Sequence, residues 1–242
     1  MSFRRIWHLS MGWVVIVLLA ACGGNNTTTT TALSPGAKLL QQAQHIALRD
    51  ATFTIDFTAD RAHDVGTGAL TTKPIRFALI VKHTDSASAP VTVNVIGYGV
   101  ENAIFLYSRL NNSGLWSMLN DGADGYFVNY DTEILNYDQL SAAKLIGPAT
   151  IDNQTTWHIQ ATVTMQLYAQ DGTLIPSTGG EEIWLRQSDA FPVEIHKSVA
   201  GSGTASDGTQ TNLSLQATYR FTTWNTGATV KLLDPSQIAA SG

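Results

Sequence analysis

Apolar and polar residues alternate one by one along three long stretches of the sequence. In Ala51–Ala59 every second residue is apolar, with Thr or Asp between. The same alternation runs through Thr155–Tyr168 and Thr211–Phe221. A period of two places successive side chains on opposite faces of a β-strand, so each stretch is predicted to be a strand with one apolar and one wet face. Such strands are typical of antiparallel sheets.

Shorter apolar runs predict further strands, and clusters of Gly, Pro, Asn and Asp separate them, as at Lys73-Pro74 and Asp171-Gly172. The glycine-rich segment Ala200–Gln210 is interpreted as a long hairpin tip, with a gate over a binding site as the alternative. The predicted shorter strands are Val65–Leu70, Ile75–Lys82, Val91–Gly97, Ala103–Ser108, Leu115–Met118, Ala149–Ile151, Glu182–Gln187, Phe191–Val199 and Thr229–Leu232.

Two segments have helical spacing instead. In "SPGAKLLQQAQHIALRD", Ser34 is a candidate N-cap, Pro35 suits the first helical position, and Leu and Ala recur every three or four residues. An amphipathic helix of about 13 residues is predicted there. The segment "DTEILNYDQLSAAK", Asp131–Lys144, is predicted to be a second helix.

About eleven strands with one wet face and only two helices predict a mostly β protein of the α+β class. The simplest arrangement is a single strongly curved antiparallel sheet or half-barrel whose helices cover the concave apolar face. Two short helices cannot fill a broad trough, so a hydrophobic cavity is expected. For each large side chain, ordinary core packing is the alternative. The candidate cavity-lining residues are Phe53, Ile55, Phe77, Leu79, Phe105, Trp157, Ile159, Trp184, Leu215 and Tyr219.

The N-terminal segment has the composition of an export signal. Arg4 and Arg5 precede an apolar run that ends in Leu19-Ala20-Ala21-Cys22, and Cys22 is the only cysteine of the 242 residues. These four residues resemble the bacterial lipobox, in which the thiol is acylated and the peptide is cut before it. An uncleaved membrane anchor is the alternative, but a spanning helix needs about 20 apolar residues, and His8, Ser10 and Gly12 interrupt this run.

This interpretation divides the chain into three parts. Residues 1–21 are predicted to be a lipoprotein signal peptide, residues 22–33 the lipidated cysteine with a flexible Thr-rich tether, and residues 34–242 the β domain. Two or three acyl chains on Cys22 would hold the protein durably on a membrane, since each buried methylene contributes about 0.8 kcal/mol. The expected location is extracytoplasmic, on the outer side of the cytoplasmic membrane or on an outer membrane if the cell has one.

The net charge of the chain bears on whether it binds nucleic acids or anionic headgroups. The sequence has 14 basic and 19 acidic residues, and two of the basic ones, Arg4 and Arg5, lie in the signal segment. Cleavage leaves 12 basic residues and a net charge near −7. Nucleic acids and anionic headgroups favour basic surfaces, so no nucleic-acid partner is expected.

Catalytic and metal-binding motifs are weak. Gly201-Ser202-Gly203 lacks the spacing and the strand–turn–helix context of a nucleophile elbow. The histidines are scattered, with no pair at i,i+4, so each is interpreted as a polar-face or edge residue rather than a metal ligand. "NDGADG" at Asn120–Gly125 lacks the alternating acidic ligands of a calcium loop and is interpreted as a plain turn. We therefore expect neither an enzyme nor a metal site, and the sequence indicates no cofactor.

Several segments between Ser34 and Ile238 resemble one group of proteins. They are "ALRDATFTIDFTAD", "GTGAL" followed by "KPIRFALIV", "GPATIDNQTTWHIQATV", "EEIWLRQSDAFPVEIHKSV" and "ATYRFTTWNTGATVKLLDPSQI". The order of a Trp-bearing strand, a short polar turn and "FPVEI" is the most specific. The chain is similar here to the LolA-like and LppX/LprG-like bacterial lipoproteins. That resemblance implies an unclosed barrel that carries lipids or lipidated proteins between membranes, and it assigns no binding residue.

Two functions from different classes follow. The first is a membrane-anchored lipoprotein that binds or carries a lipid or another acylated hydrophobic ligand in an apolar cavity, which would need more than about 300 Å³. The second is an envelope interaction or sensor lipoprotein that fills the concavity with its own side chains and binds another protein at its exposed edges. A folded spacer without a ligand is a third possibility.

Overall fold

The alternating segments become the strands of one sheet. A computed structural model describes residues 33–59, 62–85, 89–100, 103–118, 135, 137, 140–169, 171 and 173–239; the predicted signal peptide, Cys22 and the tether up to Ala32 lie outside them. One helix, Pro35–Gln44 (α1), precedes the sheet. The strands are Asp50–Ala59 (β1), Ala62–Thr72 (β2), Ile75–Asp85 (β3), Val91–Val100 (β4), Ala103–Leu110 (β5), Ser117–Met118 (β6), Leu140–Ile151 (β7), Gln154–Tyr168 (β8), Leu174–Arg186 (β9), Pro192–Thr204 (β10) and Gln210–Trp224 (β11).

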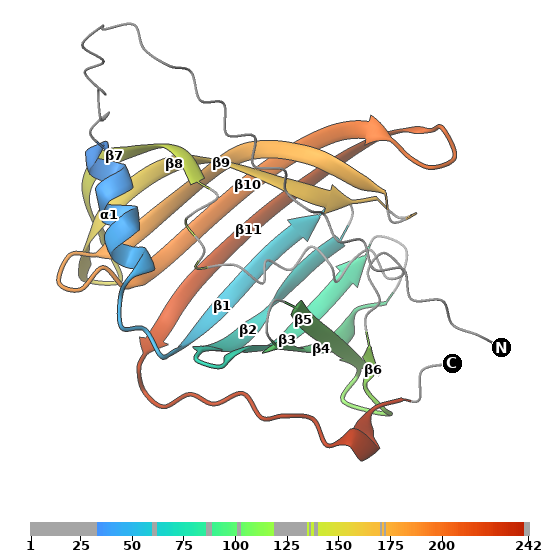
Figure 1. Ribbon diagram of the computed structural model, residues 1–242. Helices are drawn as coiled ribbons and strands as arrows, with labels where there is room; N and C mark the ends of the chain where they lie inside the picture. The colour runs from blue at the N-terminus through green and yellow to red at the C-terminus, as the bar shows by residue number, and fades with distance from the viewer. Residues whose placement is uncertain are drawn as a thin grey trace, which may run out of the picture. The chain divides into compact units, whose positions relative to one another are not determined.

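All eleven strands belong to one antiparallel sheet, in the order β6-β5-β4-β3-β2-β1-β11-β10-β9-β8-β7 (Figure 1). Two hairpin series, β1 to β6 and β7 to β11, meet where β1 pairs with β11. The two ends of the sheet, β6 and β7, do not pair with each other, so the sheet stays open. The predicted fold class, a mostly β protein with one open antiparallel sheet, is confirmed.

Helix α1 begins as predicted. The Ser34 side chain accepts a hydrogen bond from the Ala37 N–H at 3.1 Å, and Pro35 occupies the first turn. The Ser34 hydroxyl also donates to the Ala143 carbonyl, so the same residue caps the helix and ties it to β7. Leu40 and Ala43 face the core. The helix therefore lies against β7, at one edge of the sheet (Figure 1).

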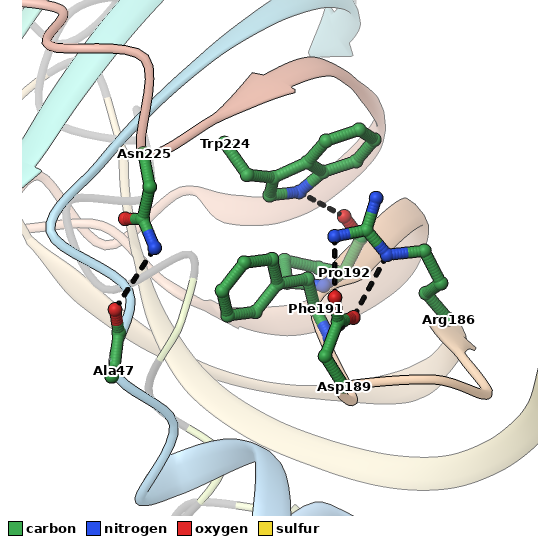
Figure 2. Close-up of polar contacts among 7 residues, drawn as sticks. All are labelled: Ala47, Arg186, Asp189, Phe191, Pro192, Trp224 and Asn225. Carbon is green, nitrogen blue, oxygen red and sulfur yellow. Dashed lines mark hydrogen bonds and ion pairs between the residues drawn. The ribbon is translucent and has the colours of Figure 1, made fainter.

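The helix is ten residues long, shorter than predicted. The chain after it is held by Asn225, whose amide nitrogen donates to the Ala47 carbonyl at 3.1 Å, as Figure 2 shows. The Asn225 amide oxygen accepts from the Arg49 N–H at 2.7 Å. These tertiary hydrogen bonds satisfy backbone groups that a longer helix would have used, which is why Ala47–Arg49 lead into β1 instead.

The predicted helix Asp131–Lys144 is wrong at its C-terminal end. Leu140–Lys144 open strand β7, where Leu140 pairs with Val163 of β8. The register shifts between Ser141 and Lys144, and Ala142 has a φ of 51°. Such a bulge adds one residue to the strand, so it breaks the period of two that identifies strands in a sequence. Of the remaining segment, only Leu135 and Tyr137 are described.

Of two other predictions toward the C-terminus, one is wrong and the other, a hairpin tip, is correct in kind but too long. Thr229–Leu232 is not a strand; side chains hold this segment instead, since Tyr98 donates to the Lys231 carbonyl at 3.1 Å and accepts from the Leu233 N–H at 2.7 Å. The long loop predicted at Ala200–Gln210 is mostly a continuation of β10 and β11, and only Ala205–Thr209 form the turn.

The segment "EEIWLRQSDAFPVEI" forms the end of β9, a turn and the start of β10. Its polar side chains stabilise this turn. The Arg186 guanidinium donates two hydrogen bonds to the Asp189 carboxylate, at 2.8 and 2.6 Å, and lies 4.6 Å from the ring centre of Trp224 (Figure 2). The Trp224 indole N–H donates to the Pro192 carbonyl at 2.7 Å. The cluster thereby joins the β9–β10 turn to the end of β11.

Candidate functional site

Eight of the ten candidate cavity-lining residues share one face of the sheet. The register shows this: Phe53 lies beside Gly68, which pairs with Leu79, and Ile55 lies beside Tyr219. We call this side the apolar face. The eight are Phe53, Ile55, Phe77, Leu79, Trp157, Ile159, Leu215 and Tyr219, and all except Trp157 belong to one buried apolar cluster that includes both halves of the sheet.

Trp184 lies on the opposite face, which corrects its assignment. It pairs with His158 of β8 and Glu194 of β10, and its ring stacks on the His158 ring with centroids 4.4 Å apart. The three consecutive residues Ile183, Trp184 and Leu185 are all apolar and buried. A run of this kind has no alternation, so the sequence cannot assign its faces. The side chain of Phe105, the tenth candidate, lies outside what the structure describes.

Two aromatic rings of the apolar face lie over glycines of neighbouring strands. A Cβ atom on Gly97 would be 2.0 Å from the Phe77 ring, and one on Gly68 would be 2.4 Å from the Phe53 ring. Phe53 also contacts Tyr219 edge-on, with centroids 6.0 Å apart. The rings therefore fill places that the glycines leave open. Phe53 and Phe77 are 1% and 8% exposed, so both rings are packed in the core.

Four charged or titratable side chains interrupt the apolar face, and none of them was predicted from the sequence to lie there. They form two pairs: His83 Nδ1 lies 2.6 Å from Asp64 Oδ1, and Lys197 Nζ lies 3.2 Å from Glu181 Oε2. The register places both pairs in one row across the sheet, with Phe57 and Ala217 between them. We call Asp64, His83, Glu181 and Lys197 the polar row.

Burying the polar row costs free energy, because its charged groups lose their hydration. The side chains of Lys197 and Glu181 are 8% and 3% exposed, and that of Asp64 is 2% exposed. Desolvating a charge costs several kcal/mol unless a partner compensates. A signal for the row does exist in the sequence: Lys197 occupies an apolar-phase position between Ile195 and Val199. It was missed because surface charges are so much more common than buried ones.

The opposite, polar face carries a trough of about 550 Å³. Its lining crosses five strands and includes Asp56 of β1, Gln216 of β11, His196 of β10, Glu182 of β9 and Gln160 of β8. Carboxylate, amide, imidazole and hydroxyl groups dominate this lining. The trough is therefore not the hydrophobic cavity predicted from the sequence.

Neither a metal-binding cluster nor a membrane-spanning helix is found within the described residues. Among them, no group of three or more His, Cys, Asp or Glu side chains is arranged to hold a metal ion. Within the same part of the chain, no helix is both long enough and apolar enough to cross a membrane.

Known proteins resemble this chain in structure, and no match is found by sequence. No family model and no curated protein matches the sequence. The structure is similar to lipoprotein LppX from Mycobacterium tuberculosis, with 13% identity and a TM-score of 0.40, over 80% of this chain and 98% of that chain. It is also similar to LprF from Mycobacterium bovis, with 13% identity and a TM-score of 0.42, over 84% of this chain and 99% of that chain.

Proposed function

We propose that this protein is a membrane-anchored extracytoplasmic lipoprotein that binds or carries a lipid, or another acylated hydrophobic ligand, on the apolar face. One observation carries the proposal: the sheet has far more apolar face than its described helix can cover. Eleven strands about 4.8 Å apart span about 48 Å. Helix α1, with ten residues, is only about 15 Å long and lies at β7.

The chemistry of the face suits acyl chains. Its side chains are mainly aliphatic and aromatic, and they join into one continuous cluster that runs, in the order of the sheet, from β4 to β8. Removing an acyl chain from water onto such a surface stabilises a complex by about 25 cal/mol per Å² of apolar area. Recognition of this kind needs an apolar space that is large enough for the chain and excludes water, with few polar groups to fix the ligand's orientation. It requires no catalytic residue, so we propose binding rather than catalysis.

The alternative, a protein partner bound at an exposed sheet edge, finds less support. Edge strand β7 has two register shifts, between Ser141 and Lys144 and between Leu145 and Gly147, and it contains Pro148. Bulges and proline disrupt the regular ladder that an added strand needs. The other edge strand, β6, has two residues. An edge-docked partner is therefore the second candidate.

Native mass spectrometry of the full chain, purified from a bacterial envelope in detergent, tests the ligand directly. We expect adducts that dissociate as intact lipid when the collision energy rises, because a chain buried on a dry face is retained after the micelle is removed. A bare protein mass, both as purified and after incubation with an envelope lipid extract, would contradict the proposal and favour a protein partner.

Anchoring at Cys22 has its own test. Replacing Cys22 with serine should remove metabolic labelling by a palmitate analogue and move the protein out of the membrane fraction, because one thiol carries the lipid attachment. The proposed anchor would be wrong if the Cys22→Ser protein still fractionated with membranes through an intact N-terminal segment. Alanine at Ser34, outside the lipobox, is the matched control and should leave both labelling and fractionation unchanged.

A further inference from the structure

The polar face of the sheet carries an apolar band over strands β2–β6. Three of its side chains are largely exposed: Val65 at 45%, Ile80 at 54% and Met118 at 44%. The register links them diagonally across the face through two partly buried residues, Ile96 and Tyr107. Exposed apolar side chains that form a contiguous patch are typical of surfaces that bind a partner or a membrane. We call Val65, Ile80, Ile96, Tyr107 and Met118 the apolar band.

Four basic residues flank the apolar band. Arg76 and Lys82 of β3 and Arg109 of β5 occupy polar-face positions of the register. Lys231 lies near the end of β4, where the Tyr98 hydroxyl donates to its carbonyl at 3.1 Å. Among the described residues, none of the four forms an ion pair. We call Arg76, Lys82, Arg109 and Lys231 the basic rim.

Within the described strands β2–β6, no carboxylate occupies a polar-face position. The acidic residues of these strands are Asp64 and Asp85, and both occupy register positions of the apolar face. The neighbouring carboxylate on β1, Asp56, lies 2.9 Å from His63 Nε2. The apolar band therefore lies in a surface whose uncompensated charge is positive, and this surface favours an anionic partner.

A bilayer with anionic headgroups fits both properties of this surface. Apolar side chains enter the boundary between headgroups and acyl chains, where tyrosine rings are also favoured, and Lys and Arg are attracted to anionic headgroups. A second copy of this chain fits less well, since a two-fold symmetric contact would bring one basic rim against the other. The net negative charge of the chain does not oppose the contact, because charges more than about 10 Å from the bilayer are largely screened.

The proposed anchor keeps this surface within reach of a bilayer. Residues 22–33 reach about 40 Å at full extension, so the acyl chains on Cys22 alone would allow the domain many orientations. A surface tethered beside its partner binds at a high effective concentration, so a weak contact is enough to select one orientation.

We propose that the apolar band and the basic rim form a docking surface for an anionic lipid bilayer. The polar face of β2–β6 then lies against the membrane that carries the anchor, and the apolar face of these strands is directed away from that membrane. This inference rests on the proposed anchor at Cys22.

Site-specific fluorescence on the full chain, processed and lipidated in a bacterial envelope and then reconstituted in vesicles, tests the docking. Acylation occupies Cys22, so Thr67→Cys, at an exposed position beside Ile80, provides the one free thiol for an NBD label. Thr164→Cys, exposed on the polar face of β8, is the matched label in the other half of the sheet. We expect the emission at Thr67→Cys to shift to the blue in phosphatidylglycerol vesicles and not in phosphatidylcholine vesicles, with no shift at Thr164→Cys.

Substitutions in the Thr67→Cys protein separate the contributions of charge and apolar surface. Lys82→Gln should lower the ratio of docked to undocked protein about fivefold, the worth of one lysine near an anionic surface. Ile80→Thr, which keeps a β-branched side chain on the strand, should lower it to a similar extent. Lys144→Gln, at an exposed polar-face position of β7, is the control and should leave the ratio unchanged.

Flotation of the same vesicles distinguishes a failure of the docking surface from a failure of the anchor. Raising NaCl from about 0.1 M to about 1 M should reduce the shift without releasing the protein, because salt screens the basic rim and not the acyl chains. Protein that floats without a shift at Thr67→Cys, with equal shifts at both labels or in both lipids, or with a shift that salt does not change, would overturn the docking surface while leaving the anchor intact. If the protein does not float, the proposed anchor fails, and the docking surface fails with it.

Discussion

Replacing Lys197 with methionine should lower the free energy of unfolding by about 4 kcal/mol, because it leaves the Glu181 carboxylate buried without its cation. Both side chains are almost fully buried, and their charged atoms lie 3.2 Å apart. Methionine keeps most of the volume of the lysine stem, so the loss would come from the charge and not from a cavity. Urea unfolding followed by circular dichroism measures the change.

Two control variants sharpen this prediction. Methionine at both Lys197 and Glu181 should recover most of the loss, since a buried pair can be replaced by apolar residues at little cost. Asp56→Asn breaks the exposed contact with His63 on the other face, where both side chains are at least half exposed, and should change stability by less than about 1 kcal/mol. If the Lys197→Met protein were as stable as the parent, the polar row would not be buried as described.

Alanine at Gly179 and alanine at Gly180 should have opposite effects. A Cβ atom on Gly179 would lie 1.9 Å from the Ser198 carbonyl oxygen, whereas one on Gly180 would meet nothing within 4 Å. Gly179→Ala must displace the backbone of β10 and should cost about 3 kcal/mol. Gly180→Ala should stabilise the protein by about 0.5 kcal/mol, because glycine within a strand costs entropy on folding.

The two substitutions form a matched pair, because they make the same chemical change at adjacent positions of β9. Thermal unfolding of both variants under one buffer condition measures the difference directly. Equal midpoints would show that the β9–β10 register is not the one described. A gain at Gly180 would also mark the open floor of the polar-face trough, to which Gly180 contributes.

The two buried pairs of the polar row lower the stability that the apolar face could otherwise reach. Ion pairs on an otherwise apolar face contribute less stability than aliphatic residues of similar size. Residues that a protein keeps at a cost in stability are often those that its function uses.

Much of the fold could be predicted because the period of two survives wherever strands pair regularly. Ala51–Ala59, Thr155–Tyr168 and Thr211–Phe221 are all within strands, and their apolar phases lie on one face. The Ser34 cap with Pro35 likewise identified the start of α1, since capping depends only on local residues. Prediction failed at β7, where bulges break the period, and at Trp184, where three apolar residues follow one another.

The sequence by itself therefore determined the class of fold, the apolar face and the start of the helix, because these depend on local spacing and local hydrogen bonds. Only the tertiary structure decided where α1 ends, since Asn225 of a distant segment holds Ala47 and Arg49. It also decided that Lys197 meets Glu181. Partners from separate strands come together only through sheet register, and register depends on the whole set of strand pairings, not on any one segment.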